Sequence, residues 1–168
     1  MTETLTGIRV RLRASTGADV DDLLTVLTHP GVREVWRDYG RDTVRDELVG
    51  PTTFAIELDD QVVGLIQFYE NDDPEYRYAG MDIAVHPDFH GQGLGQDAVR
   101  TLARHLIENR GHHRLVIDPA ADNRRAIRTY AAVGFQPVGI MRQYAQGPDG
   151  SWHDGLLMDL LAAELTPG

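Results

Sequence analysis

The sequence predicts an α/β fold of the α+β type, in which one mixed sheet of about seven strands carries helices on both faces. Three observations lead to this prediction: short apolar runs alternate with polar residues, longer segments have apolar residues at helical spacing, and the two kinds of segment are interleaved. The chain has 168 residues and is expected to form a single domain over 1–168, since domains typically have about 100–200 residues.

The N-terminal part is expected to begin with a strand and a helix. Alternating apolar residues predict a strand over 8–13, and a capping box that starts at Thr16 predicts a helix that ends at His29. Two short helical turns are expected over 32–36 and 43–49.

Three strands are expected next, over 54–58, 61–69 and 78–85. Two adjacent aspartates form the tight turn between the first two strands. The acidic run 70–75 precedes the third strand and forms either a wall of a binding pocket or a solvated loop, which is the usual place of a charge run.

The C-terminal part alternates helices and strands. Apolar stripes and runs predict helices over 98–107 and 123–133, and strands over 114–118, 135–141 and 153–161. A Gly-Pro-Asp-Gly turn joins the last two strands and favours a hairpin.

The composition excludes several kinds of chemistry. The chain has no cysteine, which excludes disulfides, thiolate nucleophiles and iron–sulfur clusters. All 16 basic residues are arginine, so no lysine is present for a P-loop or a Schiff base. The net charge of -10 argues against a nucleic-acid partner and favours a cationic substrate.

We expect a cytoplasmic location, no membrane partner and no metal. No apolar run approaches the ~18 residues that a membrane span needs, and the N-terminal segment has no apolar signal core. Among the seven histidines, His112 and His113 are adjacent and diverge on a strand, while His86 and His90 have no carboxylate at ligand spacing.

A glycine-rich turn with the sequence HGQGLG occupies 90–95, between a strand and a helix. Glycines let backbone N–H groups approach an anion, and the helix N-terminus adds partial positive charge. The turn is therefore typical of a phosphate or diphosphate site. Its spacing departs from the dinucleotide pattern G-x-G-x-x-G, and an ordinary strand-to-helix turn is the alternative.

Three motifs together resemble the GCN5-related N-acetyltransferase (GNAT) superfamily over about residues 8–161: Val85-His86-Pro87, the glycine-rich turn, and Asn123-x-x-Ala126-x-x-x-Tyr130-x-x-x-Gly134-Phe135. The resemblance implies the GNAT fold, with a splay between the fourth and fifth strands. It also implies acetyl-CoA as cosubstrate and transfer of the acetyl group to a primary amine.

A narrower resemblance concerns Gly80-x-Asp82 and the segment from Asp118-Pro119 to Gly134-Phe135, which look like the aminoglycoside 6'-N-acetyltransferases of antibiotic resistance. It implies direct transfer to the 6'-amine of a small polycationic acceptor. The alternatives are a protein N-terminal acetyltransferase of the ribosomal-protein type and a non-catalytic acetyl-CoA-binding module. A monomer and a homodimer are both compatible with the sequence.

The resemblance also implies the cofactor-binding residues. Backbone amides of the glycine-rich turn hold the CoA diphosphate, and an adjacent strand pairs with the pantetheine arm. The family motif begins with Gln or Arg where this chain has histidine. The residues expected to bind the cofactor are Ile83, Ala84, Val85, His90, Gly91, Gln92, Gly93, Leu94, Gly95, Gln96 and Asn123.

Amine acylation needs a group that takes a proton from the ammonium. Asp82 is the candidate, because aspartate is disfavoured in strands and its face neighbours, Gly80 and Ala84, leave room for a ligand. A strand aspartate that pairs with an arginine is the alternative.

The reaction also needs a proton donor for the departing thiolate and a hydrogen-bond donor for the thioester oxygen. By resemblance, the hydroxyl of Tyr130 is the first, and a backbone N–H near Val85 is the second. A core aromatic with its hydroxyl at the surface is the alternative for Tyr130.

The acceptor is expected to contact Trp36, Asp82 and Asp118. Asp118 lies at the mouth between the splayed strands and suits a second ammonium group, although an aspartate before proline is also typical of a turn. Trp36 is expected either to stack on a sugar ring or to cover the core.

Overall fold

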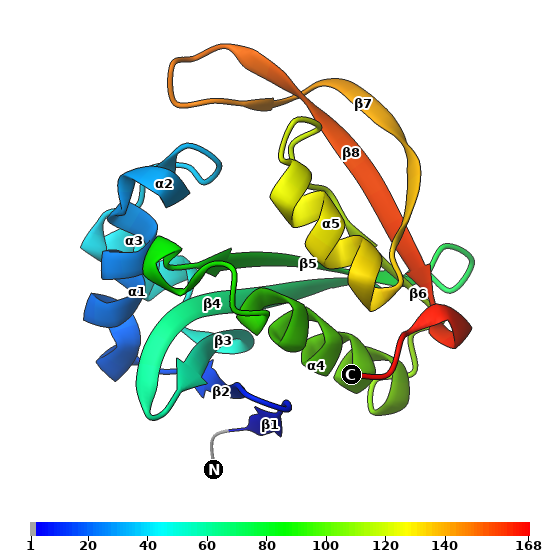
Figure 1. Cartoon of the computed structure of the whole chain (residues 1–168), viewed down its shortest axis with the longest axis horizontal. Helices are drawn as coiled ribbons and strands as arrows, with labels where there is room; N and C mark the ends of the chain where they lie inside the picture. The colour runs from blue at the N-terminus through cyan, green and yellow to red at the C-terminus, as the bar shows by residue number, and fades with distance from the viewer. Residues whose placement is uncertain (1–2) are drawn as a thin grey trace.

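One mixed sheet runs through the middle of the molecule (Figure 1). The computed structural model of this chain describes residues 3–168, and within them the sheet has eight strands in the order β1-β2-β3-β4-β5-β6-β8-β7. The strands are β1 (Thr4–Thr6), β2 (Arg11–Ser15), β3 (Gly50–Leu58), β4 (Gln61–Asn71), β5 (Tyr78–Val85), β6 (Arg114–Ile117), β7 (Gln136–Gln146) and β8 (Trp152–Leu161). The predicted fold class is confirmed.

Helices cover both faces of the sheet. They are α1 (Val20–Thr28), α2 (Pro30–Arg33), α3 (Arg41–Glu47), α4 (Leu94–Glu108) and α5 (Arg124–Val133), with single 3₁₀ turns at Gly17–Asp19, Pro87–Phe89 and Ala162–Glu164. The larger core, which includes α4 and α5, contains Met81, whereas the cluster around α1, α2 and α3 contains Ala84. Residues an odd number apart point to opposite faces of a strand, so the two cores lie on opposite sides of β5.

Within the part of the chain that the structure describes, no helix is both long and apolar enough to cross a membrane.

The strands β5 and β6 separate soon after they meet. β5 pairs with β4 along its whole length, but it pairs with β6 only at Ala79–Leu115 and Gly80–Val116. Beyond Gly80, one edge of β5 therefore faces a gap in the sheet. This is the splay that the sequence resemblance implied.

The strand predicted over 8–13 begins only at Arg11, as β2, and β1 over Thr4–Thr6 is a separate strand that was not predicted, which is why the sheet has one strand more than expected. Gly7 closes a turn through its N–H to the carbonyl oxygen of Val10 at 2.8 Å. Asp97, a buried residue of α4, holds this turn because its carboxylate accepts three backbone N–H groups at 2.8–3.0 Å, those of Ile8, Arg9 and Val10. A contact with the distant helix α4 thus determines the backbone conformation here, in spite of the local alternation of apolar and polar residues.

Replacing Asp97 by alanine is expected to lower the free energy of unfolding by about 3 kcal/mol, because the N–H of the buried Val10 and two partly buried N–H groups lose their acceptor. Thermal denaturation would show a Tm lower by about 6–12 °C for a chain of this size. Asp22→Ala, at an exposed position of α1, is the matched control. Equal Tm values for the two variants would contradict this role of Asp97.

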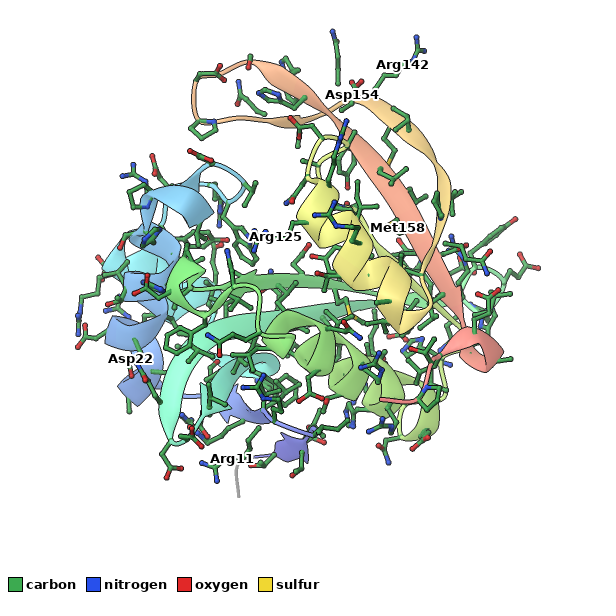
Figure 2. The ribbon with its side chains drawn as sticks, viewed as in Figure 1. Arg11, Asp22, Arg125, Arg142, Asp154 and Met158 are labelled. Carbon is green, nitrogen blue, oxygen red and sulfur yellow. The ribbon has the colours of Figure 1, made fainter. Side chains whose placement is uncertain are left out.

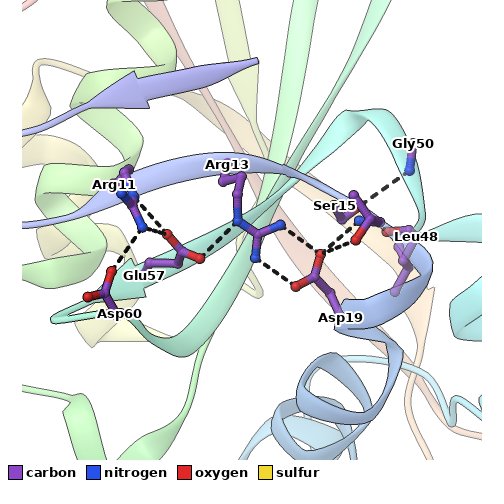
Figure 3. Close-up of polar contacts among 9 residues, drawn as sticks. Arg11, Arg13, Ser15, Asp19, Leu48, Gly50, Glu57 and Asp60 are labelled. Atoms are coloured by element: carbon purple, nitrogen blue, oxygen red, sulfur yellow. Dashed lines mark hydrogen bonds and ion pairs between the residues drawn. The ribbon is translucent and has the colours of Figure 1, made fainter. Parts of the chain in front are cut away.

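Arginines of β2 connect this strand to β3 and to the start of α1 (Figure 3). Arg11 and Arg13 donate to the two carboxylate oxygens of the buried Glu57 at 2.8 and 2.9 Å. Arg13 also pairs with Asp19 at 2.7 Å, and Asp19 accepts the backbone N–H of Thr16 at 2.7 Å, as the predicted capping box requires. These buried carboxylates have cationic partners and so have a structural role.

The hairpin of β7 and β8 projects beyond the rest of the sheet (Figure 1). Its register shifts between Met141 and Ala145, where Gln143 has a left-handed backbone with φ of 49°. The extra residues bend β7, and the hairpin arches over the loop that precedes α5.

Candidate active site

A pocket of about 350 Å³ lies between β5, α2, α5 and the glycine-rich turn that precedes α4. It brings together most of the residues that the sequence singled out, from three distant parts of the chain. Those in its wall are Trp36, Ile83, Ala84, Val85, His90, Gly91, Gly93, Leu94, Gly95, Gln96, Asn123 and Tyr130. Gln92, Asp82 and Asp118 are not in this wall.

The glycine-rich turn supplies unpaired backbone donors to the pocket. Gly91 and Gly93 both have φ of 76°, a left-handed conformation that other residues adopt at a cost. Apart from the adjacent residues of the chain, no atom lies within 4 Å of the position that a Cβ would take at either glycine. Because α4 begins at Leu94, the first N–H groups of this helix have no intrahelical partner and are available to an anion.

His90 links the glycine-rich turn to the end of β5. Its ring Nε2–H donates to the carbonyl oxygen of Val85 at 2.8 Å. Burial lowers the pKa of His90, and the nearby positive charge of Arg125 acts in the same direction, so the ring is neutral at pH 7. The histidine that replaces Gln or Arg of the family motif therefore fixes the turn from inside the protein.

The free edge of β5 provides further backbone groups. The N–H of His86 donates to the carbonyl oxygen of Val63 in β4 at 2.8 Å. The N–H and C=O of one residue point to the same side of a strand, and those of the next residue point to the other side. The N–H groups of Ile83 and Val85 therefore point away from β4 and into the gap beside β6. These groups can pair with an extended ligand, and one of their N–H groups can stabilise a developing oxyanion.

Asp82 and Asp118 lie opposite each other across the same gap. The parallel register at Gly80–Val116, continued by two residues, sets Asp82 level with Asp118. Burial, and then the negative charge of Asp118, raise the pKa of Asp82 to about 6. A carboxylate with this pKa is ionised at neutral pH and is a stronger base than an ordinary aspartate.

Three polar side chains near this carboxylate pair were not singled out from the sequence. Gln67 donates to Asp82 at 3.5 Å, and the Tyr144 hydroxyl donates to Asp118. Burial, and then the charges of Asp118 and Asp82, raise the pKa of Tyr69 to about 12. Gln67 and Tyr69 could have been identified only from the pairing of β4 with β5, which sets Gln67 beside Asp82 and Tyr69 beside Gly80.

Tyr130 lies on α5 with its ring buried, at 6.4 Å from the ring of Phe135. It belongs to the larger core and also to the pocket wall, so both interpretations of this residue describe part of its position. Burial, and then the charge of Asp82, raise the pKa of Tyr130 well above its usual value of 10. The phenol therefore stays protonated and can act as a hydrogen-bond donor at neutral pH.

Asn123 and Trp36 each take part in the internal structure of the protein and also line the pocket. The side-chain oxygen of Asn123 caps α5 by accepting the N–H of Ala126 at 3.2 Å, while the residue lines the pocket. Trp36 packs against the smaller core, with its ring 6.1 Å from that of Tyr39, and also lines the pocket.

The acidic run 70–75 is not part of the pocket wall. Glu70 belongs to β4, and its carboxylate contacts Arg110 and lies 2.5 Å from Nε2 of the buried His112. These partners lie just beyond the C-terminal end of α4, whereas the glycine-rich turn precedes its N-terminus. The exposed remainder of the run is a solvated loop.

Arg125, on α5, also lines the pocket (Figure 2). The sequence motif contains this arginine, but no role was assigned to it. Its charge and its proximity to His90 place a cation beside the glycine-rich turn, where it suits a phosphate group.

The family model of the acetyltransferase (GNAT) family matches residues 20–135, which is more than half of the chain. The chain therefore belongs to the acetyltransferase (GNAT) family.

A curated relative is the [ribosomal protein bS18]-alanine N-acetyltransferase of Escherichia coli strain K12. It is 40% identical over 82 residues, which are 47% of this chain and 52% of the relative. The chain thus spans about half the length of the curated relatives that it matches first.

Two solved structures resemble the whole fold. The first is RimJ of Mycobacterium smegmatis in complex with CoA-disulfide, with a TM-score of 0.85, 22% identity, and coverage of 99% of this chain and 90% of that chain. The second is AAC(6')-Ib in complex with paromomycin and acetyl-CoA, with a TM-score of 0.76, 23% identity, and coverage of 93% and 95%. These likenesses show the fold.

Proposed function

We propose that this chain is an acetyl-CoA-dependent N-acetyltransferase that acetylates a primary amine of a small polycation, such as the 6'-amine of an aminoglycoside. The membership of the GNAT family supports acetyl transfer. The observation that carries the acceptor class is the pair of carboxylates, Asp82 and Asp118, on either side of the gap between β5 and β6. The repulsion between the two carboxylates is best relieved by an acceptor with two ammonium groups.

In the proposed reaction, the backbone N–H groups of the glycine-rich turn and Arg125 bind the phosphates of acetyl-CoA. The free edge of β5 holds its extended arm and directs the thioester toward Asp82. Acetyl-CoA supplies the acetyl group. Each of these residues binds or orients a reactant, which converts transfer to an intramolecular event within the complex.

Proton transfers complete the reaction. Asp82 takes a proton from the ammonium, directly or through a water, and frees the amine to attack the thioester carbon. The N–H of Ile83 or Val85 stabilises the negative charge on the oxygen. Tyr130 donates its hydroxyl proton to the sulfur as the carbon–sulfur bond breaks, and the second proton of the attacking nitrogen passes to the phenolate, which restores the hydroxyl. The products are the acetamide and CoA.

Release of free CoA thiol from acetyl-CoA tests the acceptor class. Kanamycin and tobramycin are compared with peptides that have an N-terminal alanine. We expect turnover of the aminoglycosides with a higher kcat/KM than any peptide. Turnover of peptides alone would contradict the proposed acceptor, and binding of acetyl-CoA without thiol release for any amine would point to a non-catalytic module.

A protein N-terminal acetyltransferase is the second candidate. The likeness to the bS18-alanine N-acetyltransferase favours it, although this likeness covers only part of each chain. The acidic net charge of -10 suits a basic ribosomal protein as well as an antibiotic. An α-amine, however, brings a single ammonium to two carboxylates, so this candidate leaves Asp118 unexplained.

The acidic limb of the pH profile should move to lower pH in the variant Asp118→Asn. Activity needs ionised Asp82, so kcat/KM of the parent should fall as the pH drops through about 6. Without the charge of Asp118, Asp82 ionises at a lower pH. The profile is best measured from about pH 5 to 8 with a monoamine, which does not need a second anionic site. An unshifted limb would show that the two carboxylates do not interact.

A further inference from the structure

The hairpin of β7 and β8 is attached to the loop that carries Asp118. The N–H of Leu156 donates to the carbonyl oxygen of Pro119 at 2.8 Å, and the N–H of Ala121 donates to that of Asp154 at 3.0 Å. The chain immediately after Asp118 is therefore fixed by β8, and the position of β7 relative to this aspartate is set by the hairpin.

A local distortion of β7 aims one tyrosine at Asp118. Gln143 has a φ of 49°, and its N–H donates to the carboxylate of Asp154 at 2.8 Å, which stabilises the shift in register. The following residue, Tyr144, lies against Gly155, where a Cβ would come within 2.9 Å of the Tyr144 ring. Its hydroxyl donates a hydrogen bond to the carboxylate of Asp118.

The hydrogen bond opposes a repulsion. Asp118 is only partly buried, and the charge of Asp82 favours rotation of the Asp118 carboxylate away from the gap and toward water. Tyr144 counteracts that rotation, because a hydroxyl donor to an ionised carboxylate makes a stronger hydrogen bond than a neutral pair does. The hydrogen bond to Asp118, and then burial, raise the pKa of Tyr144 above its usual value, so the phenol stays protonated.

We propose that Tyr144 is a positioning residue that holds Asp118 toward Asp82 and thereby makes the site selective for acceptors with more than one amine. This inference rests on the proposed function and names the part of the chain that determines specificity. The hairpin of β7 and β8, which contributes nothing to the pocket wall, would then select the acceptor.

The test compares two acceptors with the same reacting group. Kanamycin carries several amines, whereas 6-amino-6-deoxyglucose carries only one. In the variant Tyr144→Phe, we expect kcat/KM for kanamycin to fall about tenfold, mainly through a higher KM, because one hydrogen bond to a charged group contributes about this factor. The value for 6-amino-6-deoxyglucose should change by less than about twofold. Tyr76→Phe, on an exposed loop, is the matched control and should change neither value.

A double-mutant cycle separates positioning from a direct contact of the tyrosine with the acceptor. If Tyr144 acts through Asp118, the variant Tyr144→Phe/Asp118→Asn should be no worse than Asp118→Asn alone. Additive losses, or equal losses for the two acceptors, would overturn the inference while leaving the proposed function intact. A parent enzyme that acetylates peptides but neither aminosugar would overturn the proposed function, and the inference with it.

Discussion

Replacement of Asp82 by asparagine is expected to lower kcat by roughly 10²–10⁴, the usual contribution of a general base. Asparagine keeps the size of the side chain and can still bond to Gln67, but it cannot accept a proton. The carboxylate has a pKa of about 6 because it is buried near Asp118, which matches it to proton transfer at neutral pH. Steady-state thiol release with a saturating amine measures the loss, and an unchanged kcat would remove Asp82 from this role.

Stability provides the control for this variant. The folded-state pKa of Asp82 is about 6, above its ordinary value of 3.8, so the folded chain binds this proton more tightly than the unfolded chain does. Ionisation of Asp82 therefore lowers the stability of the folded chain. This loss develops as the pH rises from about 4 to about 6 and is fully present at pH 7. Asp82→Asn should therefore raise the free energy of unfolding at pH 7 by about 3 kcal/mol, and by much less at pH 4. A less active but more stable variant excludes misfolding as the cause.

Replacement of Tyr130 by phenylalanine is expected to lower kcat by roughly 10²-fold, at the lower end of the range for a general acid. The aromatic ring and its packing against Phe135 are retained, and only the hydroxyl is lost. Because the raised pKa of Tyr130 keeps the phenol protonated, the loss should be nearly independent of pH between about 6 and 8.

The matched measurement for Tyr130→Phe is the affinity for CoA. Calorimetric titration should give a Kd within about threefold of the parent value, since one hydroxyl contributes little to the binding of so large a ligand. If kcat is retained, Tyr130 is a core aromatic only. If kcat and affinity fall together, the hydroxyl binds the cofactor and has no special role in the departure of the thiolate.

Local patterns in the sequence predicted most of the fold. The strand expected over 78–85 is β5, and the two aspartates expected to form a tight turn, Asp59 and Asp60, both have positive φ. The helix expected from Asn123 begins one residue later, because Asn123 is its cap. In each case the signal lies within a few neighbouring residues.

Contacts between distant residues account for what the sequence did not reveal. The turn that delays the start of the first predicted strand depends on Asp97, which follows that strand by more than eighty residues. Glu70 belongs to a strand, where its carboxylate contacts Arg110 and His112, and neither is near it in the chain.

The candidate site likewise contains residues that only contacts between distant parts of the chain bring together. A motif marks the glycine-rich turn and Asn123, whereas Tyr69 and Tyr144 become neighbours of the carboxylate pair only through strand pairing and a shift in register. A single sequence contains the alternation of a strand but not its partner or its register.

We propose that backbone amides of residues 91–96 bind the diphosphate of CoA and thereby direct the thioester to the gap between β5 and β6. A crystal structure of the chain with bound CoA tests it most directly. We expect diphosphate oxygens within hydrogen-bond distance of these amides, the pantetheine arm along Ile83 to Val85, and the sulfur beside the Tyr130 hydroxyl. A complex with the diphosphate elsewhere on the protein, or with the sulfur turned away from Asp82, would contradict it.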